Sequence, residues 1–402
     1  MKVERMGLIK KTVFSIRKYG ISTTAKRIIA FASEMMHPTK YYYEFALLPA
    51  PQAWREEPLQ SGQLEINWYI PEFEVGSGGH MTVFRLVRFL REFGHHHRIV
   101  LVPPTKLDNR LQLKSIVTKH FLDLGDTEFF LWGEEVPACD ISVATGWQTA
   151  YFVNAQENTK QKFYLVQDYE PMFYPMSSSY ILAENTYKMK LRCIAASPWL
   201  AKMLQVKYGT QADFFSLAYS PEEYYPQDRN RELKTVTFYA RHCTERRGFE
   251  LGILALQLVK RTDPDIKIIL YGAEGYPCVP FECEKRGILS QKELAYLYNT
   301  ATVGLVISLT NYSLIPNEMM ACKLPVVDMK TECTNTMYAD GEEIILAQPE
   351  PRAIADAILN LVGDPGRRAL IAEKAYEKVI TLSWEKAARR VEEILLGSHC
   401  SS

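Results

Sequence analysis

The chain has 402 residues, 47% of them apolar, and 47 basic side chains balance 47 acidic ones, so its formal net charge is zero. That balance excludes a protein whose whole surface serves nucleic acid or an anionic membrane, and the length suffices for about two domains with full cores. The charge is unevenly placed, because residues 1–40 carry nine Lys or Arg against two Glu, a net +7, and the remainder carries −7.

The cysteines and the N-terminus predict the compartment. Eight cysteines are scattered without a CxxC pair, which predicts reduced thiols and a cytoplasmic protein. Lys10, Lys11, Arg17 and Lys18 interrupt the first residues before an apolar core can form, so we predict no signal peptide. No run of 18 apolar residues occurs, so we predict no spanning helix. The expected location is the cytoplasm, with a peripheral position on the inner face of the plasma membrane left open.

The predicted elements begin with a basic helical extension and wrapping segment, residues 1–62. Apolar residues recur at helical spacing over 4–19 and again over 21–36. They can form an amphipathic pair that rests on anionic lipid, or two helices packed on the following domain. The pattern does not separate these alternatives.

From residue 64 onward, short β-rich runs alternate with helical patterns, and a segment rich in Pro and charge over 219–233 interrupts the series. The helical patterns cover 79–93, 107–121, 177–191, 198–208, 247–261, 290–299, 316–323, 351–362, 366–382 and 384–396. Such alternation predicts an α/β fold with two Rossmann-like, doubly wound domains, 63–218 and 219–383, that face each other across a cleft. We expect residues 384–402 to form a C-terminal helix that crosses back to the first domain.

Ligands of open α/β sheets bind at the carboxyl ends of the strands, so we looked for chemistry there. After the first strand, Gly76 to Gly79 form a Gly-rich turn that opens a helix, an arrangement that suits phosphate. The third glycine of a dinucleotide fingerprint is replaced by Met81. An anion site at Gly78 and Gly79 and a plain tight connection are therefore equally open.

Two motifs of the second half carry charge to strand ends. Arg241 and Arg247 flank one βα loop and can grip a diphosphate bidentately, although this motif alone fits a solvated basic turn better. Glu318 lies in a short helix after a buried strand. It can cap that helix from its first turn or accept hydrogen bonds from a ribose, and spacing does not separate the two.

Three motifs that look like metal sites are set aside. His95 to His97 are adjacent and point to different faces, and the Asp263-Pro264-Asp265 motif falls in a turn at the amino end of a strand. Cys278 and Cys283 lack partners at zinc spacing. We predict no metal site and no cofactor.

Residues 234–396 resemble the retaining GT-B glycosyltransferases of family GT4. The family's strand ending in G-R-L-x-x-x-K-G matches Ala240 to Gly248, with Arg247 in place of the usual Lys. IILYGAEG, GILSQKELAYLY and EMMACKLPVV match further family motifs in the same order. In the first half, GSGGHMTVFRLVRFLREFGH looks like the family's Gly-Gly helix. The resemblance implies the GT-B fold.

The resemblance also implies roles for the residues at the matching positions. Arg241 and Arg247 would hold the diphosphate of a nucleotide-sugar donor, aided by backbone amides around Ser313 and Leu314. Glu318 would hold the ribose or deoxyribose, and Gly272 would line the base pocket. Gly78 and Gly79 would bring backbone up to the donor or acceptor.

Two departures from the family pattern affect the expected substrate. The Glu that usually contacts the donor sugar is replaced by Thr310, and a glycine of the same loop by Ser313. The family's His after a central strand of the first domain is not evident; Asp168 or Gln167 occupies the comparable strand end. Asp168 is our candidate for orienting the acceptor hydroxyl, with a loop-capping Asp as the equal alternative.

The chain is most similar to bacterial rhamnosyltransferases of S-layer and surface-polysaccharide assembly, through YLVQDYEPMFYP together with Thr310. This similarity implies a dTDP-L-rhamnose donor, a polysaccharide or lipid-linked glycan acceptor, and no nucleic-acid partner. A GT-B epimerase or hydrolase and a non-catalytic sugar-nucleotide-binding subunit of an assembly complex are the alternatives. A nicotinamide-dependent dehydrogenase is disfavoured by Met81.

Overall fold

The computed structural model describes residues 43–59 and 62–397. It divides into two compact units, which we call the N unit and the C unit. The N unit comprises residues 43–220 together with 310–314 and 380–397; the C unit comprises 221–309 and 315–379. The basic segment predicted to form helices over 4–19 and 21–36 lies outside the described residues.

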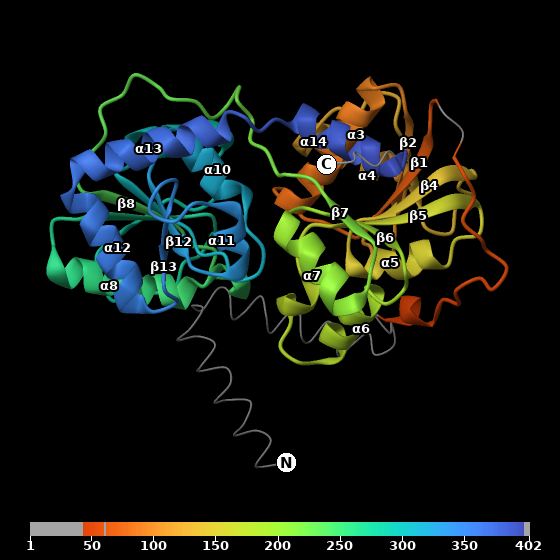
Figure 1. Cartoon of the computed structure of the whole chain (residues 1–402), viewed down its shortest axis with the longest axis horizontal. Coiled ribbons are helices and arrows are strands. Elements are labelled where there is room, and N and C mark those ends of the chain that lie inside the picture. Colours follow the sequence, from red (N-terminus) through yellow and green to blue (C-terminus); the bar gives the residue numbers. More distant parts are fainter. Residues whose placement is uncertain (1–42, 60–61, 398–402) are drawn as a thin grey trace, which may run out of the picture. The chain divides into compact units, whose positions relative to one another are not determined.

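The N unit is built on a sheet of seven parallel strands in the order β3-β2-β1-β4-β5-β6-β7 (Figure 1). In register, Trp68 lies opposite Ile99 on one side and Val143 on the other. The strand order reverses between β1 and β4, the switch point of a doubly wound sheet. The strands are β1 Glu65–Ile70, β2 His96–Leu101, β3 Glu128–Leu131, β4 Cys139–Ala144, β5 Thr159–Val166, β6 Arg192–Ala195 and β7 Ala212–Phe214.

Helices cover this sheet. They are η1 Glu44–Leu47, α3 Gly78–Glu92, α4 Arg110–His120, α5 Trp147–Asn154, η2 Glu170–Phe173, α6 Ser178–Thr186, α7 Pro198–Tyr208 and α14 Trp384–Leu395. Their ends follow local sequence signals. For example, the Ser197 hydroxyl caps α7, Pro198 opens it, and Gly209 ends it in the left-handed conformation at φ 64°.

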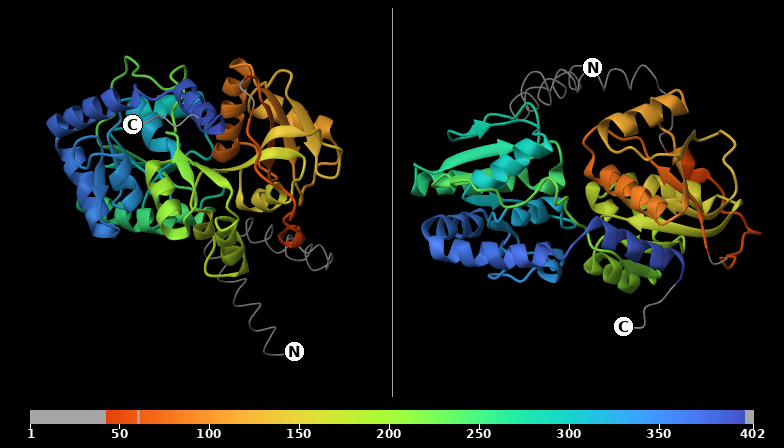
Figure 2. Two further views of the ribbon diagram at one scale, coloured as in Figure 1. Left: turned by 45° about the vertical axis from the view of Figure 1, so that its right-hand side comes forward. Right: turned by 90° about the horizontal axis from the view of Figure 1, so that it is seen from above.

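The last helix, α14, packs on α3 within the N unit (Figure 2). The Arg85 guanidinium lies 4.8 Å from the centre of the Trp384 ring. His95 Nε2 and Glu392 Oε1 are 2.9 Å apart. The buried face of α14 is apolar and includes Val391 and Leu395, so α3 is covered by residues that come almost 300 positions later in the chain.

The C unit is built on six parallel strands in the order β10-β9-β8-β11-β12-β13. The strands are β8 Thr235–Tyr239, β9 Lys267–Tyr271, β10 Glu284–Lys285, β11 Val303–Leu305, β12 Val326–Met329 and β13 Ile345–Ala347. Its helices are η3 Glu245–Arg247, α8 Phe249–Thr262, α9 Gln291–Thr300, α10 Leu314–Ala321, α11 Glu332–Met337, α12 Pro351–Gly363 and α13 Pro365–Val379. Alternate residues of β8, such as Val236 and Phe238, enter a core shared with α8 and α12.

The predicted α/β class with two Rossmann-like units is confirmed by these two parallel sheets. Several helix bounds differ from the prediction. The helix expected from 247 begins at Phe249, because Gly248 turns the chain at φ 53° between η3 and α8. The helix expected from 107 begins at Arg110, after the Asn109 side chain accepts a hydrogen bond from Gln112 N. No helix among the described residues is long and apolar enough to span a bilayer.

Candidate functional site

In the C unit, the last residue of β8, Tyr239, lies among three of the residues predicted from the sequence. The guanidinium carbon of Arg247 is 6.0 Å from the centre of the Tyr239 ring. A Cβ on Gly272 would stand 2.6 Å from Tyr239 Cε2, and Gly272 has φ +100°, so only glycine allows this close approach. Tyr239 also interacts with Arg241. The C unit therefore brings Arg241, Arg247 and Gly272 together around one ring.

The loop after β8 holds the two arginines at the carboxyl end of the strand. Thr244 N donates to Arg241 O at 3.0 Å, and Arg247 N donates to Thr244 O at 2.9 Å. A Cβ on Gly248 would come within 2.6 Å of Ile307 Cγ2, so the end of η3 packs tightly against the chain that follows β11. These contacts fix the backbone from which both guanidiniums project.

Arg241 is partly buried yet keeps its charge. Burial opposes the charged form, but the neighbouring Tyr239 and Cys243 outweigh it and raise the pKa of Arg241. A partly desolvated, permanently cationic fork is suited to a phosphate or diphosphate, which it can bind bidentately. The arrangement at this strand end is therefore chemically suited to an anion.

Glu318 lies in the second turn of α10, and the first turn of this helix contains no acidic residue. The alternative that Glu318 caps the helix from its first turn is therefore wrong. Burial raises the pKa of Tyr271 and Tyr298, whose hydroxyls are 3.0 Å apart, and the charge of Glu318 adds to both shifts. The half-buried carboxylate thus lies near the tyrosines at the end of β9 and on α9.

In the N unit, the strand end of β5 carries Gln167 and Asp168. One oxygen of Asp168 accepts from Tyr169 N at 2.8 Å, and the other accepts from the hydroxyl of Thr310 at 2.9 Å. Gln167 Nε2 donates to Gly79 O at 3.1 Å. The start of α3, which follows β1, and the loop after β5 are therefore bonded to each other, although strand β4 separates β1 from β5 in the sheet.

The segment 310–314 is anchored to the carboxyl ends of three N-unit strands. Besides the bond from Thr310, Asn311 Nδ2 donates to Gln167 O at 2.8 Å and Asn311 Oδ1 accepts from Ser197 Oγ at 3.1 Å. Leu217 N donates to the Tyr312 hydroxyl at 2.8 Å. Ser313 is buried, and its hydroxyl has no hydrogen-bond partner in the described part of the chain. The structure thus places Ser313 and Leu314 in the same unit as Asp168.

Gly78 and Gly79 form the first turn of α3. A Cβ at Gly78 would meet nothing within 4 Å, and one at Gly79 would make only ordinary contact with Gln167 at 3.5 Å. His80 holds the turn instead: its Nε2–H donates to Pro71 O at 3.2 Å, and its Nδ1 accepts from the Ser77 hydroxyl at 2.9 Å. Burial lowers the pKa of His80 to about 4, which keeps the ring neutral.

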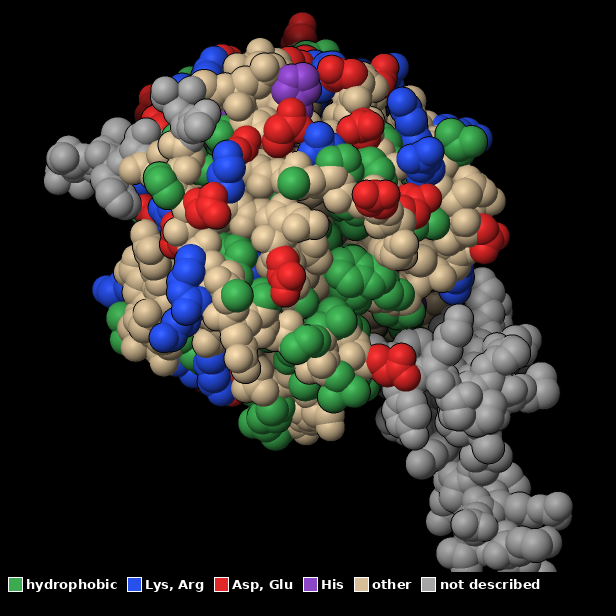
Figure 3. Space-filling model, turned by 90° about the vertical axis from the view of Figure 1, so that its right-hand side faces the viewer, with side chains coloured by type: hydrophobic (Ala, Val, Ile, Leu, Met, Phe, Trp, Pro, Cys, Tyr) green, Lys and Arg blue, Asp and Glu red, His purple; other side chains and the backbone are tan. Residues whose placement is uncertain are grey.

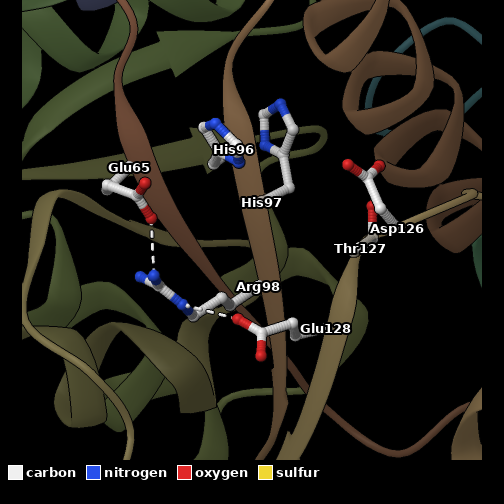
Figure 4. Close-up of a pocket in the computed structure, with 7 residues that line it drawn as sticks. All are labelled: Glu65, His96, His97, Arg98, Asp126, Thr127 and Glu128. Atoms are coloured by element: carbon white, nitrogen blue, oxygen red, sulfur yellow. Dashed lines mark hydrogen bonds and ion pairs between the residues drawn. The ribbon is translucent and has the colours of Figure 1, made fainter.

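The His and Asp residues of the motifs that look like metal sites take part in hydrogen bonds and ion pairs with neighbouring side chains. Figure 4 shows a polar pocket at the amino ends of β1 to β3, where Arg98 bridges Glu65 at 2.5 Å and Glu128 at 3.1 Å. His97 Nδ1 accepts from Trp68 Nε1 at 3.0 Å. Asp263 forms an ion pair with Lys234 at 2.8 Å. Among residues 43–59 and 62–397, no group of three or more His, Cys, Asp or Glu could hold a metal ion.

Apolar side chains remain exposed on one part of the N unit, and Figure 3 shows apolar side chains gathered on the surface. Leu47 of η1 is 82% exposed, Met176 just before α6 is 76% exposed, and Ile181 of α6 is 45% exposed. The Tyr43 hydroxyl bonds Ser179 Oγ at 2.7 Å and ties η1 to α6. These exposed residues therefore belong to one region, at the point where the described chain begins.

Comparison with known proteins gives the family. Residues 114–197 match the model of the WsaF N-terminal domain, and residues 234–359 match that of the WsaF C-terminal domain. The two matches follow the order of the two units and together cover just over half of the chain. The chain belongs to the WsaF family.

Relatives outside the family models agree with this assignment. The chain is 30% identical over 348 residues to the O-antigen biosynthesis protein RfbC of Myxococcus xanthus, a match that covers 83% of this chain and 27% of RfbC. The WsaF-like chain thus spans about a quarter of that relative's length.

Solved structures give the fold. The sucrose-phosphate synthase of Thermosynechococcus elongatus matches with a TM-score of 0.65 at 15% identity, over 85% of this chain and all of that one. HepE of Anabaena in complex with UDP-glucose matches with a TM-score of 0.62 at 14% identity, over 84% of this chain and 99% of that one. This WsaF-family chain has the GT-B fold, as the sequence predicted.

Tyr239 and His80 were not identified from the sequence. A signal for Tyr239 exists, because a large polar aromatic ends a strand whose alternate positions on the same face are Thr235 and Thr237. His80 directly follows the glycine pair, where a hydrogen-bonding ring can fix the turn.

Proposed function

We propose that this WsaF-family chain is a retaining glycosyltransferase that needs no metal ion and transfers L-rhamnose from dTDP-L-rhamnose to a growing surface glycan. The proposal depends above all on the convergence of Arg241 and Arg247 on Tyr239 at the carboxyl end of β8. Two cationic forks at that position would hold the diphosphate of the donor. The structural neighbour HepE, solved in complex with UDP-glucose, supports this class of donor.

In the proposed reaction, the bond between the anomeric carbon of the sugar and the β-phosphate oxygen breaks, and the electron pair stays on the oxygen. An acceptor hydroxyl oxygen forms the new bond to that carbon, and its proton passes to the departing diphosphate. Negative charge gathers on the diphosphate as the bond breaks, so fixed positive groups lower the barrier. Arg241 and Arg247 supply that charge, Glu318 holds the sugar of the nucleoside, and Gly272 lines the pocket for the base.

The N unit supplies the proposed acceptor side. Hydrogen bonds from Tyr169 N and the Thr310 hydroxyl hold the Asp168 carboxylate in place. We assign this carboxylate to orienting the acceptor hydroxyl. Gly78 and Gly79 present open backbone beside it, with room above Gly78 for a ligand. Ser313 contributes a buried hydroxyl without a partner among the described residues, which is available to a sugar.

The rhamnosyl specificity rests on Thr310. Its hydroxyl is engaged by Asp168, so it does not replace the sugar-contacting carboxylate expected of a GT4 glucosyl- or mannosyltransferase. The name of the relative RfbC, an O-antigen biosynthesis protein, supports a polysaccharide or lipid-linked glycan as acceptor. Residues 1–36, together with the exposed region around Leu47, are proposed to meet the membrane in which such acceptors reside.

The test uses the full chain. We expect dTDP-L-rhamnose and dTDP to raise the melting temperature more than UDP-glucose or GDP-mannose, because a ligand that binds only the folded state stabilises it. Glycan elongation, followed by mass spectrometry with rhamnan-type acceptors, then separates transfer from its alternatives. Nucleotide release without elongation would indicate the hydrolase or epimerase, and binding without turnover unless partners are added would indicate a non-catalytic subunit.

A further inference from the structure

A buried carboxyl group, Asp328, lies on the third residue of β12 in the C unit and has no exposed surface. Its Oδ1 accepts two backbone hydrogen bonds, from Ser308 N at 2.9 Å and from Met329 N at 2.7 Å. Ser308 belongs to the loop that follows β11. The carboxyl group is therefore held at the carboxyl ends of two neighbouring strands, where ligands of such sheets bind.

The other half of the carboxyl group is not satisfied. Asp328 Oδ2, Ser308 Oγ and Thr237 Oγ1 are all buried, and none has a partner with hydrogen-bond geometry among the described residues. The alternate residues of these strands, Phe238 and Val327 among them, enter the core with α8 and α12, so the polar atoms occupy the opposite face. Buried polar atoms without partners are uncommon and call for an explanation.

Burial favours the neutral form of the Asp328 carboxyl group. Burial raises its pKa to about 7, while the Met329 and Ser308 bonds and the charge of Arg247 in η3 oppose this shift. The Thr334 hydroxyl of α11 donates a hydrogen bond to Met329 O at 2.7 Å. The nearby Lys330 is paired with Asp340 at 3.3 Å, and Glu318 of α10 acts on Tyr271 and Tyr298.

Arg247 connects this carboxyl group to the proposed donor site. Leu309 N donates to Arg246 O at 3.3 Å, so η3 lies against the loop of Ser308, and the charge of Arg247 acts on Asp328. While the site is empty, the guanidinium favours the ionised form of Asp328. A bound diphosphate brings two negative charges to the same guanidinium and neutralises its field, and like charge nearby disfavours a second anion. The ligand therefore favours the protonated carboxyl, whose Oδ2–H can be donated to Ser308 Oγ.

We propose that Asp328 is a positioning residue of the donor site, which takes up a proton when a nucleoside diphosphate binds Arg247. The inference rests on the proposed function in one respect only, namely that the anion held by Arg247 is a diphosphate. Above the pH at which Asp328 ionises in the empty site, the binding of each ligand is accompanied by the uptake of one proton from solvent, which joins Asp328 Oδ2.

The experiment measures protons directly. Isothermal titration calorimetry of the full chain with dTDP-L-rhamnose, repeated in buffers of different ionisation enthalpy between pH 6 and 9, counts the protons taken up on binding. A sugar nucleotide is the right probe, because both its phosphates are esterified and lack the ionisation near pH 6 of a terminal phosphate. We expect up to one proton taken up above pH 7, and a Kd that rises about tenfold per pH unit there.

Variants assign the proton. Asp328→Asn mimics the neutral carboxyl, and we expect it to bind without proton uptake and with a Kd that is flat between pH 7 and 9. The matched control is Asp356→Asn, which removes an exposed carboxylate of α12 and should behave as the wild type. Asp328→Glu keeps a carboxyl group, and we expect it to retain the proton uptake with a different pH midpoint. This variant provides the test if Asp328→Asn does not fold.

Four other results would overturn the proposal, and they have different consequences for the proposed function. Tight binding with no proton uptake in the wild type, or uptake that persists in Asp328→Asn, removes the role of Asp328 and leaves the proposed function intact. Binding of no sugar nucleotide at any pH removes both. Uptake confined to below pH 6.5 would point to His242, whose pKa burial lowers, and would equally overturn the assignment.

Discussion

The hydroxyl of Thr310 donates to the carboxylate of Asp168 across 2.9 Å, so two positions at which the chain departs from the GT4 pattern are bonded to each other. A glutamate at position 310 would instead place a carboxylate beside the carboxylate of Asp168, which like-charge repulsion disfavours. The two departures are therefore linked. Thr310, a hydrogen-bond donor, replaces the family's Glu, and its partner Asp168 stands at the strand end where the family has His.

This pairing predicts how substitutions at the two sites combine. We expect Thr310→Val to lower the free energy of unfolding by about 1 kcal/mol, because one oxygen of Asp168 loses a donor. Thr310→Glu should cost more, and Asp168→Asn in the same chain should restore part of the loss, since an amide can donate to the new carboxylate. Urea denaturation of the two single variants and the double variant gives the coupling energy, and additive losses would contradict the pairing.

The two arginines near Tyr239 predict a loss of transfer. We expect Arg241→Ala and Arg247→Ala each to slow sugar transfer ~10²-fold or more, because the charge that develops on the leaving diphosphate loses a fixed donor. Arg352→Ala, which removes an exposed arginine of α12, is the control and should keep normal rates. The measurement is the initial rate of sugar transfer by variants whose circular dichroism is unchanged. Near-normal transfer by both Arg241→Ala and Arg247→Ala would contradict the role of these arginines.

The approach of Gly272 to Tyr239 predicts a backbone effect. Gly272→Ala adds a Cβ that would stand 2.6 Å from the ring, at a φ of +100°, and we expect a loss of about 1–3 kcal/mol in stability. Gly78→Ala, where a Cβ meets nothing within 4 Å, serves as the comparison and should change stability little. The double variant Gly272→Ala, Tyr239→Ala, in which the ring is absent, should recover part of the loss; thermal denaturation shows whether it does.

The raised pKa of Asp328 predicts a pH dependence of stability. The folded state favours its protonated form, so this carboxyl weakens folding progressively as the pH rises from its unfolded value of 3.8 through about 7. Asp328→Asn lacks this loss and should exceed the wild type in stability by up to about 4 kcal/mol at pH 8, with the difference vanishing near pH 4.

Two histidines complicate the absolute curve. Burial lowers the pKa of His80 to about 4 and that of His97 to about 3, so each favours folding above pH 6.5 and loses that contribution as the pH falls. Their effect is shared by wild type and variant, and the difference between the two chains in urea denaturation at each pH isolates Asp328. A difference that does not change between pH 4 and 8 would count against the buried carboxyl.

The exposed apolar region predicts a surface contact. We expect a chain lacking residues 1–36 to sediment less with anionic liposomes than the full chain, and Leu47→Glu with Met176→Glu to weaken binding further. Leu233→Glu, at an 87% exposed leucine of the C unit, should leave binding unchanged. Equal sedimentation of all these chains would exclude the membrane contact.

The sequence predicts the class of fold because alternation of strands and helices is a local property, visible within windows of ten residues. It also predicts Arg241 and Arg247, which flank one loop. It does not show that Tyr239 and Gly272 touch, since that contact joins neighbouring strands of a sheet. The bond from Thr310 to Asp168 joins residues 142 positions apart, and no local pattern encodes such a pairing.

Asp328 was missed for a related reason. In the sequence it is one acid inside the apolar run LPVVDM, and nothing nearby shows whether it is buried or paired. Its significance depends on Ser308, Thr237 and Arg247, which come from three other elements, and on how completely the sheet removes it from water.

The N unit takes its last pieces from far along the chain: the segment 310–314, and α14 at residues 384–395. During synthesis, a ribosome that has released residue 220 has made all seven strands of this sheet, yet Asp168 lacks Thr310 and α3 lacks its cover. The N unit is therefore complete only after most of the remaining polypeptide has been made. A gene fragment that stops at Ser220 would therefore encode an unfinished unit, and the exposed apolar face of α3 would leave it prone to aggregation.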